Sequence, residues 1–158
     1  MAVQTILNKE YLNNLFEYSD GKLFWKNHQY KAYNSKEAGC IASQGYRQVT
    51  INKKVYKVHR IIFMMKYGYF PKEIDHIDNN QLNNTIENLR EATREINNAN
   101  RRIAKNNTSS IKNVCKHRNK WVVQVKNTYI GSFDNLKNAE LAAFEARNKY
   151  YGEYANHG

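Results

Sequence analysis

The sequence predicts an α+β protein of two small domains, each built from short antiparallel strands and helices. Its 158 residues suffice for one domain or for two small ones. Hydrophobic residues make up 41% of the chain and aromatic residues 13%, which is too much for a disordered chain. Short segments in which apolar and polar residues alternate are separated by Gly or Asn turns, and other segments have apolar residues at the helical spacing. The mixture of the two periods indicates the fold class.

The first third of the chain predicts a β-hairpin region between two helices. Residues 8–18 have near-helical apolar spacing, and residues 22–25 follow an Asp-Gly turn as a strand. Residues 46–51 and 55–58 alternate around a polar tip, as in a hairpin. Residues 59–68 predict a buried helix that ends at a glycine. The outward face of the hairpin would offer four basic side chains to a partner: Arg47, Lys53, Lys54 and Lys57.

The next segment allows two interpretations. Residues 74–78 predict a strand, and a turn-prone stretch follows it. Residues 89–105 carry apolar side chains along one helical face, which predicts a single helix. Alternatively, a threonine caps a helix that starts at Arg94, and residues 89–92 form a short strand. The opposite face of the helix carries four polar side chains: Arg94, Asn97, Asn98 and Arg101.

A polar break at residues 106–110 predicts a domain boundary, with domains at 1–105 and 106–158. The second domain is expected to hold three strands with very short turns, followed by an alanine-rich amphipathic helix: residues 112–118, 120–126, 128–133 and 135–152. The core residues expected there include Phe133, Leu141 and Phe144.

The net charge of +11 favours a polyanion such as nucleic acid as the partner. A basic surface that serves only solubility is the alternative. Residues 1–105 hold 17 Lys and Arg against 10 Asp and Glu, and residues 106–158 hold 8 against 4, so both domains are basic.

Several classes of protein are excluded or disfavoured. No apolar run approaches the roughly 18 residues of a membrane span, and the N-terminal segment lacks the pattern of a secretory signal. Cys40 and Cys115 form no CxxC pair, so we expect reduced thiols and no cysteine-ligated zinc site. The expectation is a folded protein of the cytoplasm.

Asp75 and His76 are the most suggestive chemical pair. A carboxylate and an amide oxygen such as that of Asn97 are hard ligands that suit Mg²⁺ or Mn²⁺. A neighbouring histidine can act as a general base. In an extended segment the two side chains point to opposite faces, so they would serve different roles. The pair alone is weak evidence, because a histidine that is only packed or paired with a neighbour is the more common case.

The surrounding motif resembles the HNH endonucleases, in particular the phage-type homing and nicking enzymes. Asp75-His76 is followed at the family's spacing by Asn88, Arg94 and Asn97, and the segment GYRQVTINKKVYKVHR precedes it. The resemblance covers roughly residues 20–102. The family's last histidine is replaced here by Asn97, as in the phage branch, which makes Zn²⁺ or Ni²⁺ less expected than Mg²⁺ or Mn²⁺.

The resemblance implies a ββα-metal fold with its core at about residues 70–104. Asp75 and Asn97 would bind one divalent cation, and His76 would deprotonate the attacking water. Asn88 would orient the imidazole through a hydrogen bond, and Arg94 would contact a phosphate oxygen. The products would carry a 5′-phosphate and a 3′-hydroxyl. His59 and Arg60 also recur in the family, and we expect them to be structural or to contact the DNA backbone.

Residues 112–156 resemble the DNA-binding domain of the plant ethylene-response-factor family. The match includes KWVVQVK, YIGSF, the alanine-rich helix and GEYAN. The resemblance implies that the sheet enters the major groove while the helix packs behind it. Lysine replaces several of the family's arginines, which lowers the expected base specificity. The side chains expected to contact DNA, with Arg101 of the preceding helix, are Lys112, Lys116, Arg118, Gln124, Lys126 and Tyr129.

The sequence therefore predicts a metal-dependent endonuclease of the homing or nicking type that acts on double-stranded DNA. A phage-encoded monomer in bacterial cytoplasm, without a membrane or an obligate protein partner, is the expected setting. A DNA-binding regulator with an idle nuclease centre is the first alternative, and a nucleic-acid packaging protein is the second.

Overall fold

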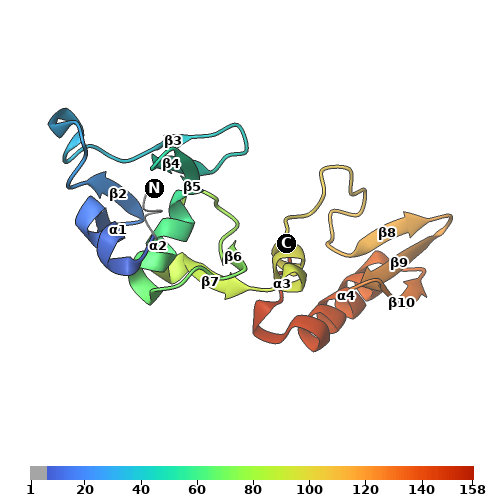
Figure 1. Ribbon diagram of the computed structural model, residues 1–158. Coiled ribbons are helices and arrows are strands. Elements are labelled where there is room, and N and C mark those ends of the chain that lie inside the picture. The colour runs from blue at the N-terminus through green and yellow to red at the C-terminus, as the bar shows by residue number, and fades with distance from the viewer. Residues whose placement is uncertain (1–6) are drawn as a thin grey trace. The chain divides into compact units, whose positions relative to one another are not determined.

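The computed structural model describes residues 7–158 and has the expected α+β class (Figure 1). The first six residues, on which part of the secretory-signal prediction rests, lie outside the described part. The chain divides into two compact units, Met1–Thr93 and Arg94–Gly158. This division into compact units does not test the predicted domain boundary between residues 105 and 106, which stays a prediction.

The first unit holds three small antiparallel sheets, formed by β1-β2, β3-β4-β5 and β6-β7. Its helices and strands are α1 (Lys9–Leu15), β1 (Phe16–Ser19), β2 (Lys22–Trp25), η1 (Lys31–Tyr33), β3 (Cys40–Ile41), β4 (Arg47–Ile51), β5 (Lys54–Lys57), α2 (Val58–Tyr67), β6 (Glu73–His76), η2 (Ile86–Asn88) and β7 (Leu89–Ala92).

The N-terminal helix is shorter than predicted. It begins after Asn8, whose side chain accepts the Tyr11 N–H at 2.8 Å, as an N-cap does. It ends before Phe16, which pairs with Trp25 in a strand and is fully buried. The prediction of a helix over 8–18 was wrong beyond residue 15, because apolar spacing alone did not reveal this strand pairing.

The predicted hairpin forms with a two-residue turn. Asn52 and Lys53 have φ of 49° and 64°, the left-handed backbone that such tight hairpins require. Lys54 therefore belongs to β5, opposite Ile51. The four basic residues of this hairpin do not share one face, because Arg47 lies on the side of buried Ile51 and Lys57 on the other side.

The helix α2 supplies six of the thirteen buried residues of the first unit's hydrophobic core. Ile61 and Ile62 are almost fully buried, together with Leu12, Phe16 and Leu23. The helix ends as predicted at Gly68, whose φ of 85° allows its N–H to bond the Met64 carbonyl. This core carries the β6-β7 hairpin through Leu89.

The β6-β7 pairing decides between the two interpretations of residues 89–105. Residues 89–92 form β7 and pair antiparallel with β6, so the version with a short strand is confirmed. The helix α3 runs over Arg94–Asn100, and residues 101–105 are not helical. A single helix over 89–105 was wrong because the apolar residues at 89 and 92 face a strand partner and not a helical neighbour.

The second unit contains α3, a three-stranded antiparallel sheet of order β10-β9-β8 and the helix α4. Figure 1 shows α4 running along this sheet. The elements after α3 are β8 (Val114–His117), β9 (Lys120–Val125), β10 (Thr128–Phe133), α4 (Leu136–Tyr151) and η3 (Gly152–Tyr154). The prediction of three strands and one helix is confirmed.

The core of the second unit lies between the sheet and α4. Val114, Val123 and Val125 pack against the buried alanines of α4, Ala139, Ala143 and Ala146. Because these side chains are small, the helix lies close to the strands.

Only one of the three predicted large core residues packs there. Phe133 is half-buried against the core, whereas Leu141 is 58% and Phe144 is 44% exposed. The prediction for Leu141 and Phe144 was wrong, because the buried face of the helix is the alanine face and these two residues project from other positions around it.

No helix among residues 7–158 is long and apolar enough to cross a membrane.

Candidate active site and DNA-contacting surfaces

Strand β6 places Asp75 and His76 next to each other with opposite orientations. Asp75 lies opposite Arg90 and His76 opposite Leu89 in the β6-β7 register. The Asp75 Oδ2 atom accepts hydrogen bonds from Arg90 Nε at 2.9 Å and from Arg90 Nη2 at 2.7 Å. This ion pair is mostly buried, with side chains 10% and 20% exposed. The carboxylate is therefore oriented by its cross-strand neighbour.

The imidazole of His76 is buried and is held by an asparagine that the sequence analysis did not single out. His76 Nε2 lies 2.9 Å from Asn84 Oδ1, and Asn84 is 3% exposed. An amide oxygen accepts, so Nε2 carries the proton and Nδ1 is the basic nitrogen of the neutral ring. A pair of adjacent asparagines in a turn-prone stretch gave no signal that one of them would meet this histidine.

Asn88 organises the loop that follows His76. Its Oδ1 accepts the Asp78 N–H at 3.0 Å, and its Nδ2 donates to Asp78 Oδ1 at 2.9 Å and to the Asn83 carbonyl at 2.7 Å. The Ile77 N–H also bonds the Asn88 carbonyl at 3.0 Å. Asn88 thus fixes the backbone immediately after the imidazole.

Asp78 is the charged centre of this loop. Partial burial alone would raise the pKa of its carboxyl, but hydrogen bonds from Asn83, Asn80 and Asn88 and the neighbouring His76 hold the pKa below its usual value. The ionised carboxylate is therefore the state that the loop is built to hold.

The hairpin β1-β2 supports the same loop from a distant part of the sequence. Tyr18 Oη accepts the Ile86 N–H at 3.1 Å. Gly21 has φ of 75°, and a Cβ atom there would lie 2.7 Å from the Thr85 nitrogen and 2.8 Å from the Asn84 carbonyl carbon. The bare glycine lets the hairpin approach the backbone of Asn84, the residue that holds His76.

His59 of α2 packs against the other side of His76. The two imidazole rings lie 4.9 Å apart at 82°, and Tyr46 lies 5.3 Å from His59. Burial, then the charges of His76, Lys57 and Arg60, lower the pKa of His59 to about 3. His59 is thus a neutral packing partner near pH 7, in line with the structural role expected for it. Arg60 is also used structurally, since its Nη2 donates to the Pro71 carbonyl at 2.7 Å.

Arg94 and Asn97 lie on α3 in the second unit, and Arg101 directly follows this helix. Arg94 and Arg101 are exposed, and Asn97 is half-buried. The far end of this helix is held within the same unit, because the Lys112 ammonium donates to the Ala99 carbonyl and Asn156 Nδ2 donates to Asn100 Oδ1 at 2.8 Å.

The basic residues of the β4-β5 hairpin are in different surroundings. Arg47 pairs with Glu37 at 3.2 Å and donates to the Gly39 carbonyl at 2.9 Å. The Lys57 ammonium lies 4.0 Å from the centre of the Tyr46 ring. Lys53 and Lys54 are exposed at and beside the turn. These last two are the most accessible cations of the predicted hairpin set.

The predicted DNA-contacting residues of the second unit do not form one surface. Gln124 and Tyr129 lie opposite each other on the face of the sheet that points away from α4. Lys116 lies opposite Trp121 on the α4 side, with its ammonium 5.4 Å from the Trp121 ring. Arg118 and Lys126 are exposed in the two turns, and Lys126 pairs with Glu95 at 2.9 Å.

Lys112 is buried and lies apart from this outer face. Burial, then the neighbouring Arg147, lower the pKa of Lys112 to about 8. Its ammonium donates to Ala99, and its carbonyl accepts from Arg147 Nη1. Lys112 thus links α3 and α4 to the start of the sheet.

Comparison with known families identifies the segment around β6 and β7. Residues 56–99 match the family model described as HNH endonuclease, and they include Asp75, His76, Asn88, Arg94 and Asn97. This segment is similar to HNH nuclease domains. The protein is accordingly an enzyme that hydrolyses DNA. No curated protein and no solved structure matches the chain.

HNH nucleases generally use a divalent metal ion. Among residues 7–158, no three His, Cys, Asp or Glu side chains are grouped in a way that could hold one. The predicted donors, the Asp75 carboxylate and the Asn97 amide, fit a hard cation that takes its other ligands from water and phosphate. Arg90 binds the Oδ2 atom of Asp75, so a cation held by Asp75 would share the carboxylate with this guanidinium.

Proposed function

We propose that the protein is a metal-dependent DNA endonuclease in which His76 is the general base. One observation carries the proposal: within the matched segment, Nε2 of the buried His76 lies 2.9 Å from Asn84 Oδ1, beside the oriented carboxylate of Asp75. A base of this kind needs a fixed ring and a defined tautomer. The Asn84 contact supplies both.

In the proposed reaction, His76 Nδ1 accepts a proton from water as the oxygen attacks the scissile phosphorus. Asn84 and Asn88 keep the ring and the following backbone in place, and Arg94 stabilises the charge on a phosphate oxygen. A divalent cation, Mg²⁺ or Mn²⁺, held by Asp75 and Asn97 would act as a Lewis acid on the phosphate and the leaving 3′-oxygen. The products carry a 5′-phosphate and a 3′-hydroxyl. Support for Arg94 and Asn97 comes from their positions in the motif.

We further propose that the outer face of the β8-β10 sheet binds DNA. Gln124 and Tyr129 lie on this face, and Arg118 and Lys126 lie at its turns. β-Ribbons enter the major groove, where base edges display the full donor and acceptor pattern. The resemblance to the ethylene-response-factor domain supports the same surface.

The phage-type motif, with Asn97 as its last member, also supports a homing or nicking enzyme encoded by a bacteriophage. We propose that it acts as a monomer in bacterial cytoplasm. One centre per chain fits nicking by a single molecule.

The test is cleavage of supercoiled plasmid and of the DNA that flanks its own gene, with Mg²⁺, Mn²⁺ or EDTA. We expect nicked or linear products with either metal and none with EDTA. His76→Ala and Asp75→Asn should each lower the rate at least about 100-fold, because each removes a group used in the transition state.

Two control variants distinguish the loss of a catalytic group from a general loss of structure. Asp134→Asn removes a carboxylate that is 84% exposed, and His157→Ala removes an exposed imidazole. Both should cut as fast as the unaltered protein. If His76→Ala also cuts at the full rate, another group is the base, and if no metal supports cleavage of either DNA, the proposal fails.

A further inference from the structure

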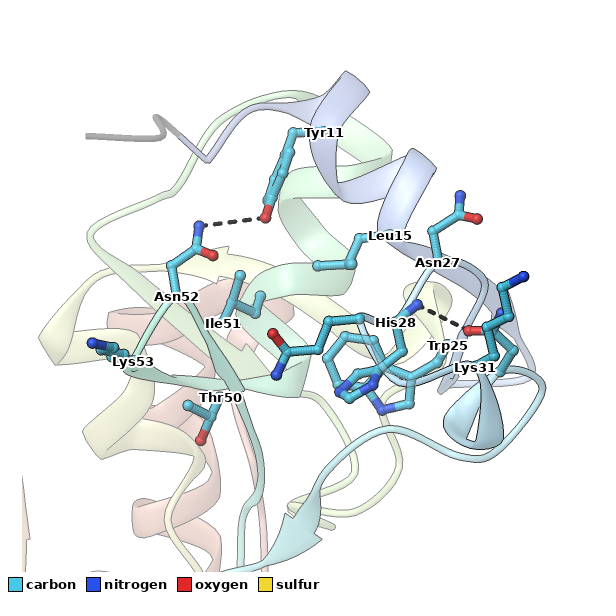
Figure 2. Close-up of a pocket in the computed structure, with 12 residues that line it drawn as sticks. Tyr11, Leu15, Trp25, Asn27, His28, Lys31, Thr50, Ile51, Asn52 and Lys53 are labelled. Atoms are coloured by element: carbon cyan, nitrogen blue, oxygen red, sulfur yellow. Dashed lines mark hydrogen bonds between the residues drawn. The ribbon is translucent and has the colours of Figure 1, made fainter. Parts of the chain in front are cut away.

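The first unit contains a recess whose lining residues are separate from the residues assigned to cleavage. Its volume is about 730 Å³, within the roughly 300–1,000 Å³ of small-molecule sites. Figure 2 shows it between α1, the segment after β2, and the turn of the β4-β5 hairpin. The recess is therefore built by three parts of the chain that meet only in the folded unit.

The inner wall is apolar and aromatic. Leu15, Trp25 and Ile51 line it, with Tyr11 and His28 at its sides (Figure 2). The half-buried Trp25 ring contacts the Phe16 ring at a tilt of 41° and the His28 ring edge-to-face at 75°, each 4.5 Å away between ring centres. A fixed aromatic ring in an open recess offers a planar group a surface for stacking.

The rim consists of amides, a hydroxyl and two cations. Four amide side chains contribute to it, from Asn27, Gln29, Asn34 and Asn52. Amides present both donors and acceptors, as recognition of a nucleobase edge requires. Three of them are already positioned, because Asn27 Nδ2 donates to the Asn14 carbonyl at 2.7 Å, Asn34 Oδ1 accepts the His28 N–H at 2.9 Å and Asn52 Nδ2 donates to Tyr11 Oη at 3.3 Å.

The charge of the recess has one sign. Lys31 and Lys53 line it and are exposed, and none of its twelve lining residues is Asp or Glu. An anionic group at the rim is therefore favoured, while a planar group is favoured inside.

We propose that this recess binds one unpaired nucleobase that carries a phosphate. The base packs against Trp25, the amides contact its edge, and Lys31 and Lys53, which lie at opposite ends of the recess (Figure 2), contact the phosphate groups on the two sides of the base. A base within a duplex is stacked and cannot enter, so the source is an unpaired nucleotide of a DNA strand or a free nucleotide. The strand source rests on the proposed action on DNA.

The fluorescence of Trp25 reports on occupancy directly. The chain has two tryptophans, so Trp121→Phe leaves Trp25 as the only one. In EDTA, we expect saturable quenching of this variant by deoxynucleoside monophosphates or by a duplex with a three-nucleotide single-stranded end. Lys31→Gln and Lys53→Gln should each raise the dissociation constant at least about threefold, because each removes a phosphate contact. Lys22→Gln removes an exposed cation that belongs to the same unit but lies outside the recess. This variant should change the dissociation constant less than 1.5-fold.

Two further DNA probes identify the source and test base recognition. If the strand is the source, the single-stranded end binds at least about tenfold more tightly than a monophosphate, whereas comparable affinities indicate a free nucleotide. Replacing the bases of that end by abasic sites should weaken binding at least about fivefold, as loss of stacking does. Equal affinity for the abasic end, absence of quenching with every probe, or equal effects of Lys22→Gln and Lys53→Gln would overturn the proposal. Because binding is measured in EDTA, an inactive nuclease would not change this result. If the recess does not bind a nucleotide, the plasmid-cleavage test of the proposed function is still valid.

Discussion

Two buried side chains on either side of the His76 ring set its chemistry. Asn84 bonds its Nε2 atom, and His59 packs edge-to-face on it. The first fixes the tautomer, while the second is a neutral neighbour that adds no positive charge near pH 7. The combined result is a fixed ring whose basic nitrogen is Nδ1.

Asn84 is predicted to be a positioning residue, which acts through His76. Asn84→Ala removes the acceptor and should lower the cleavage rate about 100-fold, because a displaced catalytic group costs about that much. Asn84→Asp keeps an acceptor oxygen and should restore part of the rate, with a pH profile moved to higher pH because a carboxylate stabilises the imidazolium. Asn138→Ala, an exposed asparagine on α4, is the control. A purely structural Asn84 would give two variants with equal rates and unshifted pH profiles.

The lowered pKa of His59 predicts a loss of stability in acid. Above pH 6.5 the imidazole is neutral in both the folded and the unfolded chain. As the pH falls from 6.5 towards about 3, the unfolded chain takes up a proton that the buried ring does not, so unfolding becomes more favourable. The contribution approaches about 1.4 kcal/mol per pH unit in the middle of that range.

His59→Gln removes this term, so the free energy of unfolding of the first unit should fall less steeply between pH 6.5 and 4.5. Urea titrations followed by Trp25 fluorescence, in the Trp121→Phe background, measure the slope. Parallel loss of stability with and without His59 would contradict the assignment.

The sequence revealed the reacting residues better than the residues that hold them. Asp75 and His76 stand out because a carboxylate and an imidazole carry recognisable chemistry. Asn84 does not, since its role depends on the path of a loop and on the approach of Gly21 from another hairpin. The chain has 23 asparagines, and their type alone does not distinguish a loop residue from a partner of the base.

Among the helices and strands, α3 depends most on contacts with neighbouring residues for its stability. It has seven residues, too few for a stable isolated helix. Its contacts within the second unit include the Lys112 bond to Ala99, the Asn156 bond to Asn100 and the Lys126 pair with Glu95. Arg94 and Asn97, the motif residues on α3, are thus carried by a helix that the C-terminal residues stabilise.

Truncation after Lys105 is therefore predicted to affect more than DNA affinity. It removes Lys112, Lys126 and Asn156, so cleavage should fall at least about tenfold even at saturating DNA. Gln124→Ala in the full chain removes a side chain from the outer sheet face and should raise KM while kcat stays the same. If the truncated chain keeps its kcat and loses only affinity, α3 does not depend on these contacts.

The range of the interactions that form each element explains which elements could be predicted from the sequence. Strands β8-β10 and α4 follow from local alternation, turns and periodicity, so the sequence predicted them well. The end of α1 and the choice between strand and helix at residues 89–92 depend on pairing with distant segments. Local patterns do not contain that pairing.

For the whole molecule, the two units divide the positive charge unequally. Residues 1–93 hold 13 Lys and Arg against 9 Asp and Glu, whereas residues 94–158 hold 12 against 5. The net charges are thus +4 and +7. Residues 94–105 account for the difference from the split at 105/106, because Arg94, Arg101, Arg102 and Lys105 outweigh Glu95. The unit that contains the proposed DNA-binding sheet therefore has a net charge of +7, compared with the +4 of residues 106–158.

This distribution predicts how salt weakens DNA binding. Each cation on a phosphate releases counterions and contributes about 0.9 to the slope of log K against log salt concentration. The double variant Arg118→Gln, Lys126→Gln should therefore reduce the magnitude of the slope by about 1.8, less whatever the Lys126 pair with Glu95 already neutralises. The double variant Lys137→Gln, Lys149→Gln removes the same formal charge from exposed positions of α4, the helix on the other side of the sheet, and should leave the slope nearly unchanged. Fluorescence anisotropy of labelled duplex DNA in EDTA at a series of salt concentrations measures both. Equal losses in the two variants would show that DNA responds to the overall charge of the unit, and the outer sheet face would then have no special role in binding.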